Sequence, residues 1–275
     1  MKNLISVVGP TGIGKTRLAI DLAKHFDTEI ISCDSRQFFK EMKIGTAAPS
    51  EEELAEAPHH FIGNLSVQDY YSIGQYEEDA LKKLNELFEK HDTVILVGGS
   101  MMYEKAVLEG LNDLPEAHAE NQEKLQNILD SEGIEKLQEI LKELDPEYFA
   151  VVDVHNHRRL LRAIDVIWQT EKKYSEQIAV SQDSRDFKVV RIGIEAPREE
   201  LYDRINRRVD MMMEQGLLEE TKGLEKYKGL TALNTVGYSE LFKYFDGEWD
   251  LDFAVSEIKK NSRRYAKRQL TWYRK

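Results

Sequence analysis

The chain has 275 residues, a length typical of one large domain or of a domain with a smaller second unit. Its net charge is −12, and no apolar run approaches the roughly 18 residues that a membrane span requires, so we expect a cytoplasmic protein without a membrane partner. Cys33 is the single cysteine, which excludes an internal disulfide. No additional apolar helix face is evident, and we therefore expect a monomer.

Strand and helix patterns alternate in the first part of the chain. Apolar, β-branched runs at 4–9, 28–34 and 92–100 predict strands. Apolar residues at helical spacing in 15–26, and from about 74 to 90, predict helices between these strands. The alternation predicts an α/β fold, with a mostly parallel sheet flanked by helices on both faces.

This alternation stops at residue 115, where two amphipathic helical stripes follow one another. We therefore expect a helical insertion domain at 115–185, and an α/β core that is formed by 1–114 and 186–275. The apolar run at 187–196 predicts a further core strand. The chain after Pro197 is predicted to be mainly helical.

The segment GPTGIGKT (9–16) satisfies the full P-loop pattern between a predicted strand and a predicted helix, so the core should be P-loop NTPase-like. Its glycines allow backbone N–H groups to converge on phosphate oxygens, and the helix N-terminus adds positive potential. We expect Mg²⁺ as a cofactor, with the Thr16 hydroxyl as its ligand. The pattern specifies a diphosphate rather than ATP. The predicted diphosphate ligands of this loop are Gly9, Thr11, Gly12, Ile13, Gly14, Lys15 and Thr16.

Two polar side chains follow predicted strands at the edge where such sheets bind ligands. An ATPase or kinase usually carries an acidic Mg²⁺ ligand after an apolar strand, but the strand TVILV ends in Gly98, Gly99 and Ser100. Asp34 follows a different strand, and it could be a base, a metal ligand, a substrate anchor or the cap of a turn. Ser100 could bind a phosphate oxygen or cap the helix that follows.

The segment 259–275 contains eight basic residues and no acidic ones, although the chain as a whole is acidic. Such asymmetry is typical of a phosphate-binding surface, and equally of a solvated helix face. Tyr265, Trp272 and Tyr273 could be stacking platforms for bases or anchors in the core. For Trp272 we expect a place in the core.

Seven segments in order resemble the tRNA dimethylallyltransferases, also called tRNA isopentenyltransferases, over almost the whole chain. The resemblance implies a P-loop α/β core with a helical insertion. It implies transfer of the dimethylallyl group of dimethylallyl diphosphate to N6 of the adenosine at position 37 of tRNA, in the anticodon stem-loop. The segments are GPTGIGKT, DSRQFFKEMKIGTAAPS, APHHFI, VGGSMMYEKAVLEGL, NHRRLLRAIDV, TVGYSEL and RRYAKRQLTWYR.

The resemblance also implies roles for individual residues. Asp34 is expected to be the general base that removes a proton from N6. Ser100, where the family usually has threonine, is expected to donate to the oxygen that joins the allyl carbon to the diphosphate. The residues expected to contact tRNA are Asp34, Ser35, Arg36, Gln37, Arg158, Arg159, Arg162, Lys267 and Arg268.

Arg162 is also expected at the diphosphate. Arg159 and Arg162 could instead pair with the nearby carboxylates of Asp153 and Asp165. Gln122 stands where relatives often have arginine, and we expect no tRNA contact there.

Other functions remain open on the sequence. A P-loop small-molecule kinase would hold ATP in the loop and its acceptor at Asp34, but the missing acid after TVILV and the basic segment disfavour it. An adenylate isopentenyltransferase would run the same chemistry on a free nucleotide, which requires neither the insertion nor the basic segment. A noncatalytic RNA-binding protein would have no use for Asp34 together with Ser100.

Overall fold

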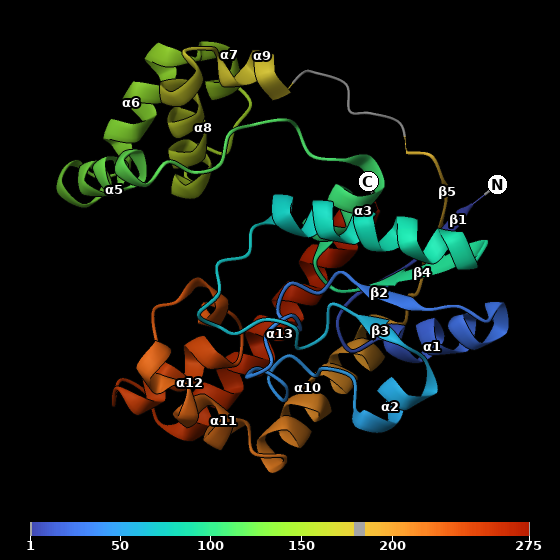
Figure 1. Ribbon diagram of the computed structural model, residues 1–275. Coiled ribbons are helices and arrows are strands. Elements are labelled where there is room, and N and C mark those ends of the chain that lie inside the picture. Colours follow the sequence, from blue (N-terminus) through green and yellow to red (C-terminus); the bar gives the residue numbers. More distant parts are fainter. Residues whose placement is uncertain (1, 179–184, 275) are drawn as a thin grey trace. The chain divides into compact units, whose positions relative to one another are not determined.

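The computed structural model describes residues 2–178 and 185–274. The chain divides into two compact units (Figure 1), the first formed by Met1–Glu109 with Ser184–Lys275, and the second by Gly110–Asp183. Within the described ranges, no helix is both long and apolar enough to cross a membrane.

A five-stranded sheet forms the centre of the first unit, in the order β3-β2-β4-β1-β5. Every neighbouring pair is parallel, which confirms the predicted α/β class. The two-residue β3 was not predicted, because a strand so short shows no alternation. The strands are β1 (Asn3–Val8), β2 (Ile30–Ser32), β3 (His59–His60), β4 (Thr93–Val97) and β5 (Lys188–Gly193).

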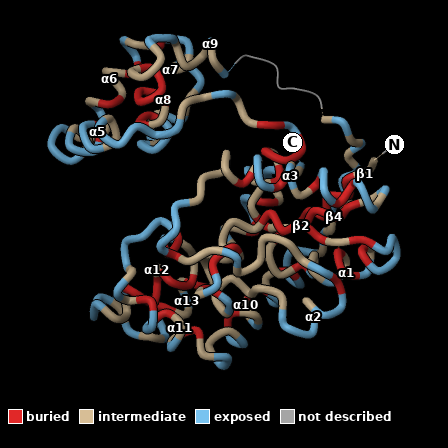
Figure 2. Tube along the Cα trace, viewed as in Figure 1, coloured by how far each residue is buried: buried red, intermediate tan, exposed pale blue. Residues whose placement is uncertain are grey.

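Helices cover both faces of this sheet, so alternate strand residues face different helices. Leu4 and Leu96 pack with α3 (Ile73–Lys90) and α4 (Met101–Glu109). Ile5 of β1 packs on the opposite face, with α1 (Lys15–Phe26). In Figure 2 the strands β1, β2 and β4 run through the most deeply buried part of this unit. Burial on both faces explains why these three strands are continuous apolar runs in the sequence.

The rest of the first unit is helical and has a hydrophobic core of its own. The basic segment at the C-terminus belongs to one long helix, α13, which packs against α10 and α12. Trp272 in its last turn is 37% exposed, so the expectation that it lies in the core is wrong. These elements are α2 (Glu51–Glu56), α10 (Arg198–Glu214), α11 (Leu217–Gly223), η1 (Glu225–Tyr227), η2 (Thr231–Leu233), α12 (Tyr238–Phe245) and α13 (Leu251–Tyr273).

The secondary structure of the second unit, among its described residues from Ala119 onward, consists of helices, and its core is formed mainly by leucine and isoleucine side chains. The buried carboxylate of Asp145 accepts hydrogen bonds from Tyr148 N and from both Ser175 N and Ser175 Oγ, which ties α7 to α9. Its helices are α5 (Ala119–Glu132), α6 (Ile134–Leu144), α7 (Pro146–Phe149), α8 (His157–Thr170) and α9 (Tyr174–Ile178).

Candidate active site

The glycine-rich loop joins β1 to α1, in the strand–loop–helix arrangement expected from the sequence. Gly14 precedes α1 with φ 102°, a left-handed conformation that favours glycine. Gly9 has φ 150°, and a Cβ there would lie 2.8 Å from Ile194 O, so a side chain would collide with the backbone beyond β5. A Cβ on Gly14 would meet no atom within 4 Å, and Gly14 and Lys15 at the N-terminus of α1 line the cleft.

Two cationic side chains face this loop. Lys15 Nζ donates to Gly9 O and Pro10 O at 3.0 Å each. Burial lowers the pKa of Lys15 to about 8, the nearby Asp34 carboxylate opposes this, and Arg208 lowers it further. Burial also lowers the pKa of Arg208, and within the described part of the chain Arg208 has no hydrogen bond or ion pair. Both cations are half-buried, and neither forms an ion pair among the described residues, so an entering anion would stabilise their charged forms.

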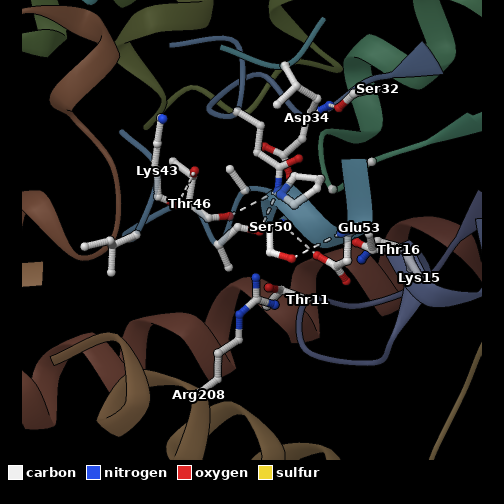
Figure 3. Close-up of a pocket in the computed structure, with 18 of the residues that line it drawn as sticks. Thr11, Lys15, Thr16, Ser32, Asp34, Lys43, Thr46, Ser50, Glu53 and Arg208 are labelled. Atoms are coloured by element: carbon white, nitrogen blue, oxygen red, sulfur yellow. Dashed lines mark hydrogen bonds between the residues drawn. The ribbon is translucent and has the colours of Figure 1, made fainter. Parts of the chain in front are cut away.

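Arg208 was not among the sequence candidates. It extends from α10 toward Thr11 in the cleft (Figure 3). Arg204 and Arg207 lie on the same helix, and Arg207 forms a surface ion pair with Asp203 at 2.7 Å. The sequence alone does not distinguish the inward arginine from its neighbours.

These groups line a cleft of about 1210 Å³ at the carboxyl ends of β1, β2 and β4. Pockets for drug-sized ligands commonly have roughly 300 to 1,000 Å³, so this cleft has room for more than one reacting group. Gly9, Ile13, Ser35, Arg36 and Ser100 are not among its lining residues. The predicted site residues that do line it are Thr11, Gly12, Gly14, Lys15, Thr16, Asp34 and Gln37.

The carboxylate of Asp34 lies against the glycine pair after β4. A Cβ on Gly98 would be 2.5 Å from the Cys33 carbonyl carbon, and one on Gly99 would be 2.9 Å from Asp34 Oδ2. Glycine is therefore required where other P-loop proteins carry an acid. Asp34 Oδ1 accepts from Arg36 N at 3.2 Å, so one oxygen caps a turn. Among the described residues no hydrogen bond reaches Oδ2, which is free to accept a proton.

Ser100 lies beside the same turn. Its Oγ accepts from Ser35 N at 2.9 Å and is 2.8 Å from Ser35 Oγ. Ser100 O also accepts from Tyr103 N and Glu104 N in the first turn of α4. Because its oxygen is already an acceptor, the Ser100 hydroxyl proton can be directed to another acceptor.

A buried amide joins the glycine-rich loop to the turn after β4. Gln269 of α13 is fully buried; its Oε1 accepts from Thr11 N and its Nε2 donates to Gly99 O, both at 2.8 Å. Tyr265 also donates its hydroxyl to Gly99 O, at 2.6 Å. Gln269 was not among the sequence candidates. The available signal was its spacing of three from buried Ala266, because a polar side chain on the buried face of a helix needs partners.

The side chains expected to contact tRNA come from three different parts of the chain. The Arg36 guanidinium donates to the carbonyl oxygens of residues 231, 232 and 234, and Gln37 Nε2 donates to Thr46 O and Ala47 O. Lys267 and Arg268 line a hollow of about 430 Å³ on α13 together with exposed Trp272.

The remaining predicted tRNA contacts, Arg158, Arg159 and Arg162, are in the first turns of α8 in the second unit. Arg162 Nη2 donates to Pro115 O at 2.6 Å, and its Nη1 is 3.6 Å from Asp165 Oδ2. The alternative that Arg162 pairs with Asp165 is therefore present in this structure. Arg162 as a diphosphate ligand stays a prediction.

Thr16 fits the expected magnesium ligand in one respect. It lines the cleft, and within residues 2–178 and 185–274 its hydroxyl has no hydrogen-bond partner. No group of three or more His, Cys, Asp or Glu residues among the described ones is placed to hold a metal. Mg²⁺ often takes few protein ligands and completes its shell with phosphate oxygens and water. The Thr16 hydroxyl would thus suit a Mg²⁺ ion whose other ligands are phosphate oxygens and water.

The parallel sheet, the glycine-rich loop and the cleft define an α/β enzyme of the P-loop type. A family model described as IPP transferase matches residues 37–275. The tRNA dimethylallyltransferase of Christiangramia forsetii is 55% identical over 272 residues, which cover 99% of this chain and 90% of that protein. The tRNA dimethylallyltransferase 1 of Bacteroides fragilis is 49% identical over 274 residues, with coverages of 100% and 91%. The chain therefore belongs to the IPP transferase family.

Solved structures agree with this assignment. The tRNA isopentenylpyrophosphate transferase of Bacillus halodurans superposes with a TM-score of 0.73 at 36% identity, covering 100% of this chain and 87% of that one. A eukaryotic dimethylallyltransferase captured acting on tRNA superposes with a TM-score of 0.85 at 26% identity, covering 99% of this chain and 70% of that one. The fold of this chain is thus that of its sequence relatives.

Proposed function

We propose that this protein is a tRNA dimethylallyltransferase. It transfers the dimethylallyl group of dimethylallyl diphosphate to N6 of the adenosine at position 37 of tRNA and releases diphosphate. Relatives that are 55% and 49% identical over nearly the whole chain carry this name, which supports the reaction class. The observation that carries the proposal is a single cleft in which Lys15 and Arg208 face the Asp34 carboxylate.

The diphosphate is bound by the glycine-rich loop. The backbone N–H groups at the start of α1 point to its oxygens, and Lys15 and Arg208 supply positive charge. When bound at Thr16, Mg²⁺ would neutralise part of the charge on the leaving diphosphate. The loop therefore holds a leaving group, and no phosphoryl group is transferred.

The nucleophile needs a base because the lone pair of an exocyclic adenine amine is delocalised into the ring. The bond from N6 to the allylic carbon forms while the carbon–oxygen bond to diphosphate breaks, and the N6 proton passes to Asp34 Oδ2. The backbone N–H of Arg36 fixes the other carboxylate oxygen and so orients the base. The Ser100 hydroxyl donates a hydrogen bond to the bridging oxygen as that oxygen gains charge, and it keeps its proton.

The tRNA reaches this cleft with its target base extruded from the anticodon loop, which costs a few kcal/mol. Phosphate contacts from Lys267 and Arg268 on α13, and from the arginines at the start of α8, offset that cost. The Gln37 side chain contacts the flipped base. We further propose that the protein acts as a cytoplasmic monomer.

Labelled dimethylallyl diphosphate, Mg²⁺ and unmodified tRNA test this function, with AMP, ATP and a tRNA that carries guanosine at position 37 as controls. We expect label only in the tRNA with adenosine at that position. Label on AMP alone would indicate an adenylate isopentenyltransferase. Nucleotide hydrolysis without prenyl transfer would indicate a kinase-like enzyme, and either result would contradict the proposal.

A further inference from the structure

The carboxylate of Glu220 binds a loop that forms one wall of the cleft. Glu220 lies on α11, and its Oε2 accepts from Lys43 N at 3.0 Å and Ile44 N at 2.8 Å. Its Oε1 accepts from Gly45 N at 3.0 Å and from Tyr238 Oη at 2.6 Å. One carboxylate therefore satisfies three successive backbone N–H groups and a phenol. We call residues 43–48 the clamped loop.

The fit around this carboxylate is close. A Cβ on Gly45 would lie 2.6 Å from the Tyr238 ring, so only glycine allows the phenol to reach Glu220. Burial raises the pKa of Tyr238 and keeps its hydroxyl a donor. The clamped loop is closed by Ala47 N to Ile44 O at 2.9 Å and Ala48 N to Lys43 O at 3.0 Å. Figure 3 shows Lys43 and Thr46 on one side of the cleft, with Lys15 and Thr16 on the other.

The clamped loop in turn fixes the side chain of Gln37. Gln37 Nε2 donates to Thr46 O at 3.2 Å and Ala47 O at 3.1 Å. Both partners are carbonyl oxygens. A flip of the side-chain amide would place its oxygen next to them and lose both hydrogen bonds, so the orientation of the amide is fixed. Both N–H groups of the Gln37 side-chain amide therefore donate to the clamped loop. The carbonyl oxygen is the group that Gln37 can offer to a ligand in the cleft that it lines.

We propose that Glu220, together with Tyr238, is a positioning residue that fixes Gln37 as a hydrogen-bond acceptor for the amino group of the substrate base. This inference rests on the proposed function. An acceptor at Gln37 binds an N–H of adenine while Asp34, three residues earlier, takes the proton that leaves. A 6-oxo purine presents oxygen at the same place and meets another acceptor, so the arrangement selects for an amino group.

Binding of anticodon stem-loops tests this selection. The loops carry adenosine, inosine, or purine riboside, which lacks the amino group, at the target position. We expect the wild type to bind adenosine about tenfold more tightly than purine riboside. Replacing Gln37 with alanine should reduce this ratio to about threefold, because Asp34 remains as an acceptor for the other N–H. The E220Q change places an NH₂ group against backbone N–H donors, releases the clamped loop, and should reduce the ratio equally.

Steady-state kinetics separate positioning from general damage. E220Q should raise the KM for tRNA about tenfold, while the KM for dimethylallyl diphosphate stays within about twofold. Y238F removes one of the donors and should raise the tRNA KM about threefold. The exposed neighbour Glu219 on the same helix provides the control, because E219Q removes the same charge and should leave both constants unchanged.

A double mutant tests the route of the effect. If Glu220 acts through Gln37, then Q37A combined with E220Q should be no worse than Q37A alone. Multiplicative losses, or an E220Q protein that keeps its tenfold preference for adenosine, would overturn the inference. If E220Q fails to fold, the Y238F variant and its base preference provide the same test. A wild type that prefers adenosine but transfers no prenyl group would contradict the proposed function alone.

Discussion

The two walls of the cleft are held in different ways. The wall formed by the glycine-rich loop is built into consecutive residues, since a strand, a turn with positive-φ glycines and a helix N-terminus follow one another from Asn3 to Phe26. The opposite wall, the clamped loop, is irregular and depends on Glu220 and Tyr238 from helices far along the chain. The glycine-rich loop and Lys15 are therefore encoded locally, whereas Arg208 of α10 and the base-facing half depend on tertiary contacts.

The largest effect should come from the locally encoded wall. K15M removes the half-buried cation of the loop and should weaken dimethylallyl diphosphate binding about 100-fold, because charge-assisted contacts to the diphosphate are lost. Isothermal titration measures this affinity. K24M, on the same helix but in a surface ion pair with Glu56, is the control and should bind normally. Equal weakening in both variants would contradict the assignment of the loop.

The pH dependence of diphosphate binding tests the same wall. Burial holds the pKa of Lys15 at about 8 in the free protein, and a bound diphosphate favours the charged form. At a pH above this pKa, Lys15 must therefore take up a proton when the diphosphate binds. The affinity should be constant below pH 8 and fall by up to about tenfold per pH unit above it. Titrations from pH 6 to 10 measure this, and in K15M the decrease should disappear.

An intermediate effect should come from the amide that joins the glycine-rich loop to the turn after β4. Q269L leaves Thr11 N without its partner, and Gly99 O keeps only the Tyr265 hydroxyl. We expect kcat to fall about tenfold and the free energy of unfolding to fall by about 2 kcal/mol. Single-turnover kinetics and chemical denaturation measure the two quantities. S256A on the exposed face of α13 should change neither, and an unchanged kcat in Q269L would argue against the coupling.

The smallest effect should come from the basic face of α13. K267A should weaken tRNA binding about threefold at moderate salt and reduce the slope of log K against log salt by about one unit or less. Filter binding over a series of salt concentrations measures this slope. K90A, at the end of α3, should leave it unchanged. A tRNA affinity that is insensitive to Lys267 would place the RNA elsewhere on the protein.

The sequence alone predicted the parts of the fold that depend on local patterns. Strands β1, β2 and β4 appeared as apolar runs because helices cover both faces of the sheet, whereas the edge strand β5 has no buried residue and was predicted from its valine and isoleucine residues. The short β3 and the exposure of Trp272 were missed, since both depend on how distant segments pack.

The candidate site shows the same division. The glycine-rich loop and Asp34 follow strands and could be predicted from their position in the chain. Arg208 and Glu220 lie outside the seven segments that resemble the family, and Gln269 lies in RRYAKRQLTWYR, which does not indicate its partners. Their contacts exist only when α10, α11 and α13 pack around the carboxyl edge of the sheet, so periodicity could indicate burial but not the partner.

Replacement of Asp34 tests the central claim most directly, namely that one wall binds the leaving group while Asp34 takes the proton. D34N keeps the shape of the side chain and the acceptor for Arg36 N but removes the base. Single-turnover transfer to tRNA should fall about 10³-fold, while the Kd for dimethylallyl diphosphate stays within about twofold. Transfer by D34N at a rate near that of the wild type would contradict the account.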